Sequence, residues 1–302
     1  MNERNILVVA HARRDDTVAA ALRVIDALRE AGARPVLPVD DRDDLVAADG
    51  RFSDVAVLGQ GVEADELELA IVLGGDGTIL RAAELVRGSG APVLGINMGH
   101  VGFLAEIERD DMDDAVRRVI ARDYEVEERL ALSIRVKDKQ GEVVYETWAL
   151  NEATVEKASR ERMIEVVIEI DGRPLSSFGC DGMVVSTPTG STAYNFSAGG
   201  PVIWPGVEAI AVVPLSAHAL FAKPLVIGPD SAVAIEMLEQ TSGTGILWCD
   251  GRRSHELPAG ARVVVRRSSR PVRLARLHPI AFTDRLVRKF QLPVAGWRGA
   301  GA

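Results

Sequence analysis

A single carboxylate lies within a glycine-rich segment, LGGDGTIL at residues 73–80. The apolar run 70–73 predicts a strand and residues 81–86 predict a helix, so the glycines occupy a strand-to-helix turn. Glycine lets a backbone approach a ligand closely, and the first N–H groups of a helix favour a phosphate. Beside such a phosphate, Asp76 could hold a metal ion or accept the proton of an attacking hydroxyl. The segment therefore indicates phosphoryl transfer, with an ordinary structural turn as the alternative.

Two familiar phosphate-binding motifs do not fit this turn. No Gly-Lys-Ser/Thr follows the glycines, so the segment is not a Walker loop. Leu80 stands where the dinucleotide fingerprint needs its third glycine. Taken alone, the turn leaves phosphoryl transfer and a structural role about equally open, and the rest of the chain has to decide between them.

Two short polar clusters interrupt apolar runs in the second half of the chain. Asn151 and Glu152 follow Leu150, and Asp181 lies between Cys180 and Gly182. A carboxamide and a carboxylate at the rim of a sheet could bind an adenine edge or ribose hydroxyls. A solvated strand end is the alternative for each cluster, and it is the favoured interpretation of either one alone.

The run 187–201, TPTGSTAYNFSAGGP, combines hydroxyls, an amide, aromatic rings and glycines directly behind an apolar strand. Such a composition can wrap a nucleotide through backbone N–H groups, hydroxyls and one stacking ring. A flexible Ser/Gly linker is the alternative. Tyr194, Phe196 and the segment 201–204 would anchor the run in a core, which argues against a linker.

The first 124 residues alternate strand and helix patterns. Strands are predicted at 6–10, 34–38 and 92–97, and helices over 18–28 and 110–124. The polar segment 40–69 predicts loops with short elements. A second glycine-bearing connection follows at 98–104, and loops after neighbouring parallel strands meet at one edge of a sheet. We therefore expect a Rossmann-like α/β domain over residues 1–124, with a ligand crevice at that edge.

The hydrophobic period changes from helical to alternating near residue 125. Alternation is clear in 130–136 and 164–170, and the Asp-Gly pairs at 171–172 and 250–251 mark turns. We expect a mainly antiparallel β domain over 125–275, without a long helix. Phe282, Leu286 and Phe290 return to helical spacing, so the segment 276–302 should supply a helix that packs back on the first domain.

Length, charge and cysteine content argue against several classes of protein. A length of 302 residues is enough for two domains, and a net charge of -9 argues against a general nucleic-acid binder. The two cysteines, Cys180 and Cys249, show neither metal-ligand spacing nor a disulfide framework. The N-terminus leads directly into a strand without a signal-like segment, and no apolar run is long enough to span a bilayer. We expect a soluble cytoplasmic protein.

These motifs, in this order, resemble the NAD kinases. The resemblance rests on GGDGT at 74–78, Gly95-Ile96-Asn97-Met98-Gly99 with Gly102-Phe103-Leu104, Asn151-Glu152, and the run from Asp181 through 189–194 to Gly199-Gly200-Pro201. It covers most of the chain. It implies an α/β domain followed by a β domain, and transfer of a phosphoryl group to the adenosine ribose 2′-hydroxyl of NAD to give NADP. The donor would be ATP or inorganic polyphosphate, with Mg²⁺ or a similar ion accompanying ATP, and the protein would be a homo-oligomer, dimer or tetramer.

The resemblance also implies roles for individual residues. Asp76 matches the proton acceptor, and no residue is expected to be a metal ligand. NAD contacts are implied at Gly77, Arg81, Asn151, Glu152, Arg162, Asp181, Thr192, Ala193, Tyr194, Asn195, Phe196 and Ser197. Arg162 is matched by spacing alone.

Two other functions share parts of this pattern. GGDGT also occurs in lipid kinases that act on diacylglycerol or sphingosine, but Asn151-Glu152 and the run at 189–194 favour a nucleotide acceptor, and no amphipathic membrane face is evident. A non-catalytic NADP-binding regulator could share the fold, and the presence of Asp76 argues against it.

Overall fold

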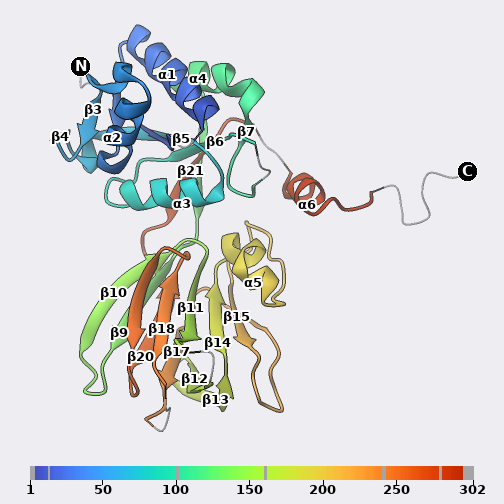
Figure 1. Ribbon diagram of the computed structural model, residues 1–302. Helices are drawn as coiled ribbons and strands as arrows, with labels where there is room; N and C mark the ends of the chain where they lie inside the picture. The colour runs from blue at the N-terminus through green and yellow to red at the C-terminus, as the bar shows by residue number, and fades with distance from the viewer. Residues whose placement is uncertain are drawn as a thin grey trace, which may run out of the picture. The chain divides into compact units, whose positions relative to one another are not determined.

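The computed structural model describes residues 4–12, 14–99, 102–159, 162–239, 243–278 and 281–294. The chain forms two compact units, one of residues 1–128 with 272–302 and one of residues 129–271 (Figure 1). Within the described residues, no helix is both long and apolar enough to cross a lipid bilayer.

The first unit is built on a sheet with the order β4-β3-β2-β1-β5-β6-β21-β8, and β7 pairs with β6. The central pairs β1–β2, β1–β5 and β5–β6 are parallel. The strands are β1 (Asn5–Ala10), β2 (Arg34–Leu37), β3 (Ala56–Leu58), β4 (Gly61–Val62), β5 (Leu67–Leu73), β6 (Val93–Asn97), β7 (Ile107–Glu108), β8 (Glu125–Arg129) and β21 (Val272–Arg276). Five helices of this unit are α1 (Asp15–Glu30), α2 (Val39–Ala48), α3 (Asp76–Leu85), α4 (Met112–Ala121) and α6 (Phe282–Phe290), counted within the described residues.

Helices cover both faces of the centre of this sheet. Ile6 and Val8 of β1 share a core cluster with residues of α1 and α4, which lie side by side (Figure 1). Leu7 and Val9 point the other way and are equally buried, and α3 contacts β5 and β6. The continuous apolar runs of the sequence are explained by this burial on two faces. Because β5 and β6 are parallel neighbours, the loops that follow them leave the same edge of the sheet.

Helix α2 is one of the elements within the segment 40–69, which was predicted as loops with short elements that the sequence did not locate. It begins after Pro38 and carries Asp40, Asp41, Asp43 and Asp44, so its sequence has little helical periodicity. Only Asp41 and Leu45, one turn apart, are buried from this helix. Two inward-facing positions are too few to produce a recognisable apolar stripe, which is why the sequence did not locate this helix.

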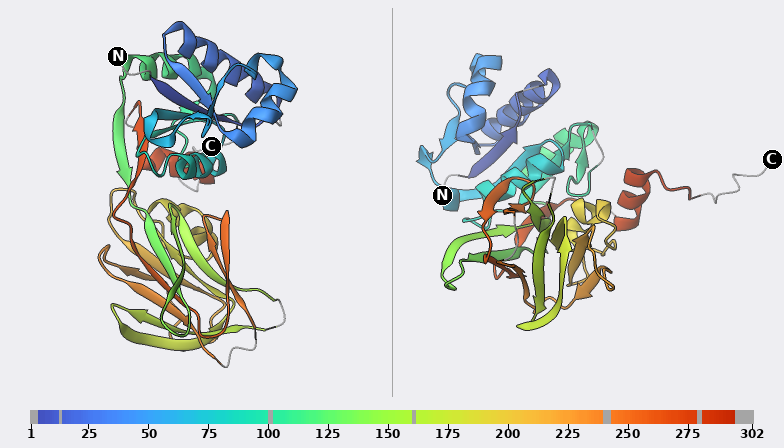
Figure 2. Two further views of the ribbon diagram at one scale, coloured as in Figure 1. Left: turned by 90° about the vertical axis from the view of Figure 1, so that its left-hand side faces the viewer. Right: turned by 60° about the horizontal axis from the view of Figure 1, so that its bottom comes forward.

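The second unit consists of two antiparallel sheets that share one core (Figures 1 and 2). One sheet has the order β10-β9-β20-β17-β12-β13 and the other β16-β15-β14-β11-β18-β19. The strands are β9 (Leu132–Lys137), β10 (Val143–Ala149), β11 (Glu152–Lys157), β12 (Ile164–Ile170), β13 (Arg173–Cys180), β14 (Gly182–Ser186), β15 (Ile210–Leu215), β16 (Leu225–Ile227), β17 (Val233–Met237), β18 (Gly245–Cys249), β19 (Arg253–Leu257) and β20 (Arg262–Arg267). The alternating residues predicted from the sequence, such as Ile134 and Val166, point into this core.

Short helices interrupt the β structure at the run 187–201. A 3₁₀ turn, Thr189–Thr192, precedes the four-residue helix α5 (Tyr194–Ser197). The predicted C-terminal helix is α6, which belongs to the first unit. Residues 279–280 and 295–302 of the predicted segment 276–302 lie outside the described residues.

Gly190 generates a prediction about stability. A Cβ built on Gly190 would lie 2.1 Å from the backbone oxygen of Asn151 and 2.4 Å from its carbonyl carbon. Because both neighbours are backbone atoms, Gly190→Ala should shift the chain and lower the free energy of unfolding by about 1–3 kcal/mol. Chemical denaturation measures this change. Gly88→Ala, where a Cβ meets nothing within 4 Å, is the matched control. Equal effects of both substitutions would contradict the clash.

Candidate functional site

Asp76 is the first residue of α3, directly after the N-cap Gly75. The sequence predicted strand, turn and helix in this order, with the carboxylate in the turn rather than at the helix start. Gly74 is required by packing, since its Cβ would lie 2.5 Å from the Thr78 hydroxyl oxygen. A Cβ on Gly75 or on the exposed Gly77 would meet no described atom within 4 Å. Packing therefore does not explain these two glycines, and they leave open space before the helix N-terminus.

Two backbone N–H groups hold the Asp76 carboxylate. Phe103 N–H donates to Oδ2 at 2.9 Å, and Leu104 N–H donates to Oδ1 at 3.0 Å. Gly102 lies against the same carboxylate, because a Cβ there would be 2.2 Å from Oδ1. The loops after β5 and β6 thus meet, as the sequence predicted, and the second loop fixes the orientation of Asp76. Each carboxylate oxygen has further lone pairs with which to accept a hydroxyl proton.

Arg81 is buried in α3 and is paired with Asp41 of α2, with 2.6 Å between Nη1 and Oδ1. Burial raises the pKa of Asp41, and the hydrogen bond and charge of Arg81 oppose that effect. The other oxygen, Oδ2, is buried and has no hydrogen-bond partner among the described residues. Asp41 was not identified from the sequence, because nothing in an acidic segment distinguishes the one buried aspartate. The assignment of Arg81 to an NAD contact stays a prediction.

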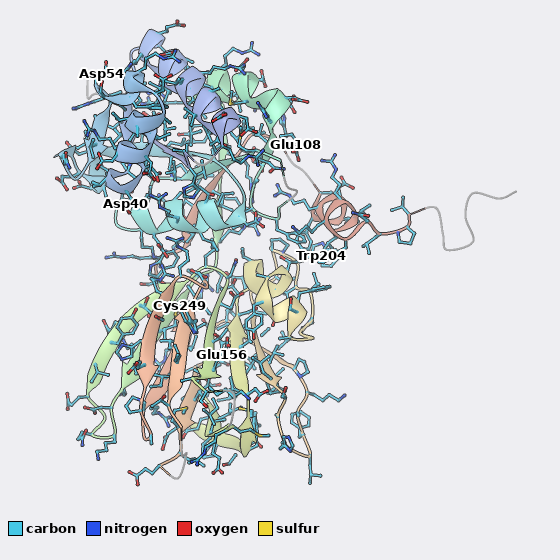
Figure 3. All side chains as sticks on the ribbon, viewed as in Figure 1. Asp40, Asp54, Glu108, Glu156, Trp204 and Cys249 are labelled. Atoms are coloured by element: carbon cyan, nitrogen blue, oxygen red, sulfur yellow. The ribbon has the colours of Figure 1, made fainter. Side chains whose placement is uncertain are left out.

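In the second unit, Glu152 lines a pocket of about 370 Å³ together with Thr154, Glu156, Tyr194, Trp248 and Gly251. Glu152, Thr154 and Glu156 alternate along β11 and face this pocket, whereas Ala153 and Val155 point into the core. Figure 3 labels Glu156 on this strand. Trp248 lies beside Thr154 on the paired strand β18, and Tyr194 comes from α5. The pocket combines carboxylates with two aromatic rings, which suits a ligand with hydroxyls and flat rings.

Glu152 and Asp250 form a pair of buried carboxylates. Burial raises the pKa of Glu152 to about 8, with a contribution from the charge of Asp250 and an opposing hydrogen bond from the Tyr194 N–H. Glu152 Oε2 has no partner among the described residues. Asp250 accepts the N–H groups of Leu150 and Asn151 at 3.0 and 2.7 Å, and it is 2.8 Å from Arg253 Nη2. Asp250 therefore fixes the backbone that leads into Glu152.

Asp250 was predicted only as a turn residue. The Asp-Gly signal identified the hairpin between β18 and β19, where Asp250 has φ 54°. Its contact with Leu150 and Asn151 joins positions that are 100 and 99 residues away in the chain. Local patterns carry no information about such a contact.

The run 187–201 divides into buried supports and exposed groups. Thr187 Oγ1 donates to the Leu150 carbonyl, and Ser191 Oγ bonds to Pro188 and Ile203. The Asn195 side chain is fully buried, and its Nδ2 donates to the backbone carbonyls of Ser191 and Pro201. Tyr194, Phe196 and Ser197 are exposed, and Thr192 and Ala193 are half-buried. The buried side chains of the run therefore fix its backbone through hydrogen bonds. Asn195 takes part in these bonds, in addition to its predicted NAD contact.

Asp181 and Arg162 lie outside the pocket lining. Asp181 is 2.5 Å from Lys157 Nζ, and this hydrogen bond and charge lower the pKa of the Asp181 carboxyl. Arg162 is exposed, shortly before β12. Asn151 is buried next to Glu152, at the start of β11. Within the described residues, no group of three or more His, Cys, Asp or Glu side chains could hold a metal ion.

Glu152 generates a prediction about pH. Its pKa is about 8 in the folded protein and near 4.5 in the unfolded chain, so between these values the folded state holds a proton that the unfolded state has lost. The free energy of unfolding should therefore fall as pH rises through this window, by at most about 1.4 kcal/mol per pH unit from this group. Glu152→Gln removes this loss, so the Tm of the variant relative to the parent should increase from pH 5 to pH 8. Glu142→Gln, at an exposed turn residue, controls for removal of one carboxylate. A difference that stays constant with pH would contradict the buried-acid interpretation.

Comparison with known proteins identifies both parts of the chain. A family model described as the ATP-NAD kinase N-terminal domain matches residues 6–124, and one described as the ATP-NAD kinase C-terminal domain matches residues 150–277. The chain is 68% identical over 297 residues to the NAD kinase of Leifsonia xyli subsp. xyli, covering 98% of this chain and 97% of the relative. It is 55% identical over 303 residues to the NAD kinase of Thermobifida fusca, covering 99% and 93%.

Solved structures agree on the fold. Yeast NADH kinase complexed with NADH aligns with a TM-score of 0.86 at 22% identity, covering 99% of this chain and 90% of that chain. An NAD kinase from Archaeoglobus fulgidus in complex with ATP aligns with a TM-score of 0.67 at 23% identity, covering 95% and 97%. The predicted α/β domain followed by an antiparallel β domain is confirmed.

Proposed function

The chain belongs to the ATP-NAD kinase family, and we propose that Asp76 accepts the proton of the adenosine ribose 2′-hydroxyl of NAD while that oxygen attacks the γ-phosphorus of ATP. Its activity is that of an NAD kinase, a transferase, as the sequence predicted. The new bond joins the ribose oxygen to phosphorus, the bond between phosphorus and the β,γ-bridging oxygen breaks, and ADP leaves. NADP is the product. ATP is the proposed donor, with inorganic polyphosphate as the alternative.

One observation supports the proposed role of Asp76. Its carboxylate is held by two N–H groups at a helix N-terminus, before which Gly75 and Gly77 leave space. A ribose hydroxyl placed there could donate to either oxygen, and the helix N-terminus would stabilise negative charge on the phosphoryl group. Phosphoryl transfer depends mostly on positioning and on neutralising charge, which this arrangement favours.

The pocket of the second unit is proposed to bind NAD. Glu152 offers a carboxyl group for hydroxyls or ring nitrogens, and Tyr194 and Trp248 offer flat surfaces to an aromatic ring. Backbone and side-chain contacts from Asn151, Asp181, Arg162 and the residues 192–197 are carried over from the family resemblance. The yeast relative is complexed with NADH and the archaeal one with ATP, which supports both ligand classes.

A divalent ion, Mg²⁺ or a similar one, is proposed to accompany ATP. Both oxygens of Asp76 accept backbone N–H groups, and the described residues supply no three-ligand cluster. The ion would supply charge neutralisation of the phosphates. The chain's own residues orient the hydroxyl and accept its proton.

We also propose a cytoplasmic homo-oligomer, a dimer or a tetramer, on the basis of the family resemblance. If an assembly completes the NAD site, specific activity should fall when the protein is diluted below its dissociation constant. Light scattering gives the mass in the same dilution series. A monomer with full activity would contradict this proposal.

Asp76→Asn tests the proposed base. The amide keeps the size of the side chain but cannot accept the proton, so kcat should fall by at least about 10²-fold while the KM for NAD changes little. NADP formation from NAD and ATP is the measurement, with diacylglycerol and no acceptor as comparisons. Asp110→Asn, at an exposed position of the same unit, is the matched control. A folded Asp76→Asn variant with near-normal kcat would exclude Asp76 from this role.

A further inference from the structure

A mostly buried arginine side chain from the C-terminal helix reaches the loop that holds Asp76. Arg285 of α6 donates from Nη1 to the carbonyl oxygens of Phe103 and Ala105, at 2.7 and 3.0 Å. Its Nη2 lies 3.1 Å from Glu106 Oε2. The Arg285 side chain is 11% exposed, and Glu106 is fully buried. Arg285 is separated from Phe103 by 182 residues in the chain.

One peptide group connects Arg285 with Asp76. The peptide between Phe103 and Leu104 presents its carbonyl to Arg285 and its N–H to Asp76 Oδ1. A trans peptide is planar and its carbonyl and N–H point in opposite directions, so fixing one fixes the other. The guanidinium and the carboxylate therefore bind opposite edges of the same rigid plane. A rotation of this plane would weaken both contacts together.

The remaining contacts of the loop do not replace this one. Glu106 already accepts the His278 N–H at Oε1 and Arg276 Nη1 at Oε2, so it has other partners besides Arg285. Arg276 also lies 3.4 Å from the Leu104 carbonyl oxygen, which belongs to the next peptide and not to the one between Phe103 and Leu104. The Phe103 ring lies 6.0 Å from Phe282 and 5.8 Å from Phe290, which places α6 against the loop without orienting its peptides.

We propose that Arg285 is a positioning residue for phosphoryl transfer, which holds the peptide between Phe103 and Leu104 so that its N–H orients the Asp76 carboxylate. Arg285 does not itself touch the substrates in this role. The inference rests on the proposed function of Asp76. It assigns to α6, the last described helix of the chain, a part in the geometry of the reacting group.

The test is a kinetic comparison of Arg285 variants in the full-length protein. Arg285→Ala should lower kcat by about 10- to 100-fold, because a small misplacement of a reacting group has an effect of that size. The KM values for NAD and ATP should stay within about threefold, since binding groups are unchanged. Arg285→Lys replaces the planar guanidinium, which donates to two carbonyls, with a single ammonium group. Its kcat should also fall, but by less than that of Arg285→Ala. Arg288→Ala, at an exposed position of the same helix, is the matched control and should keep the parent kcat.

Two further readouts separate positioning from stability. In an Asp76→Asn background, Arg285→Ala should cause little additional loss of kcat, because the group it positions is already inactive. Methylguanidinium added to Arg285→Ala should restore part of kcat by occupying the vacated site, and it should have no such effect on the Asp76→Asn variant.

If Arg285→Ala keeps the parent kcat and only its Tm is lowered, the inference is overturned. Arg285 would then stabilise the fold without positioning Asp76. Equal fractional losses in the parent and Asp76→Asn backgrounds would do the same. If Arg285→Ala does not fold, the kcat of Arg285→Lys is the test instead. An unchanged kcat in that variant contradicts the proposal. An active Asp76→Asn variant would instead refute the proposed base, so the two failures are distinguishable.

Discussion

The proposed chemistry depends on one interaction of the first unit, in which the N–H groups of Phe103 and Leu104 hold the carboxylate of Asp76. It joins the loops after two adjacent parallel strands, so it requires both the strand pairing and the helix that starts at Asp76. Gly102 has to lack a Cβ for the loop to approach this closely. The same contacts would allow a carboxylate beside the proposed phosphate site, because two donors fix its direction and its remaining lone pairs are available to a hydroxyl.

A related solution recurs in the second unit with another buried carboxylate. Asp250 binds the N–H groups of Leu150 and Asn151 and thereby fixes the start of β11. Thr187 and Gly190, in the run after β14, contact the same backbone: Thr187 through hydrogen bonds and Gly190 through close packing. Glu152 is then buried at the wall of the pocket, and its Oε2 has no hydrogen-bond partner within the part of the chain that the structure describes. In both units, backbone amides orient an acid, and the orientation depends on residues distant in sequence.

The sequence predicted those features that arise from local patterns. Apolar runs and alternation identified the parallel strands, the β domain and the helix around Phe282 to Phe290, because burial on one or two faces leaves a periodic signal. Residue type singled out the glycine turn and Asn151-Glu152 as candidates, and only the family resemblance implied an NAD contact for Asn151-Glu152. Asp41, Asp250 and Arg285 were not recognised in their roles, since each acts through a contact with a residue 40 or more positions away. A charged residue in a polar stretch gives no sign that it will be buried, so only the folded structure identifies these three.

The geometry at Asp76 is tested most directly by a crystal structure with NAD and a non-hydrolysable ATP analogue bound. The decisive quantity is the distance from the adenosine ribose 2′ oxygen to the nearer Asp76 carboxylate oxygen. We predict about 2.6–3.2 Å, the range for direct proton transfer, with the hydrogen bonds from Phe103 and Leu104 retained. A 2′ oxygen beyond the reach of Asp76, both directly and through one water, would contradict the account.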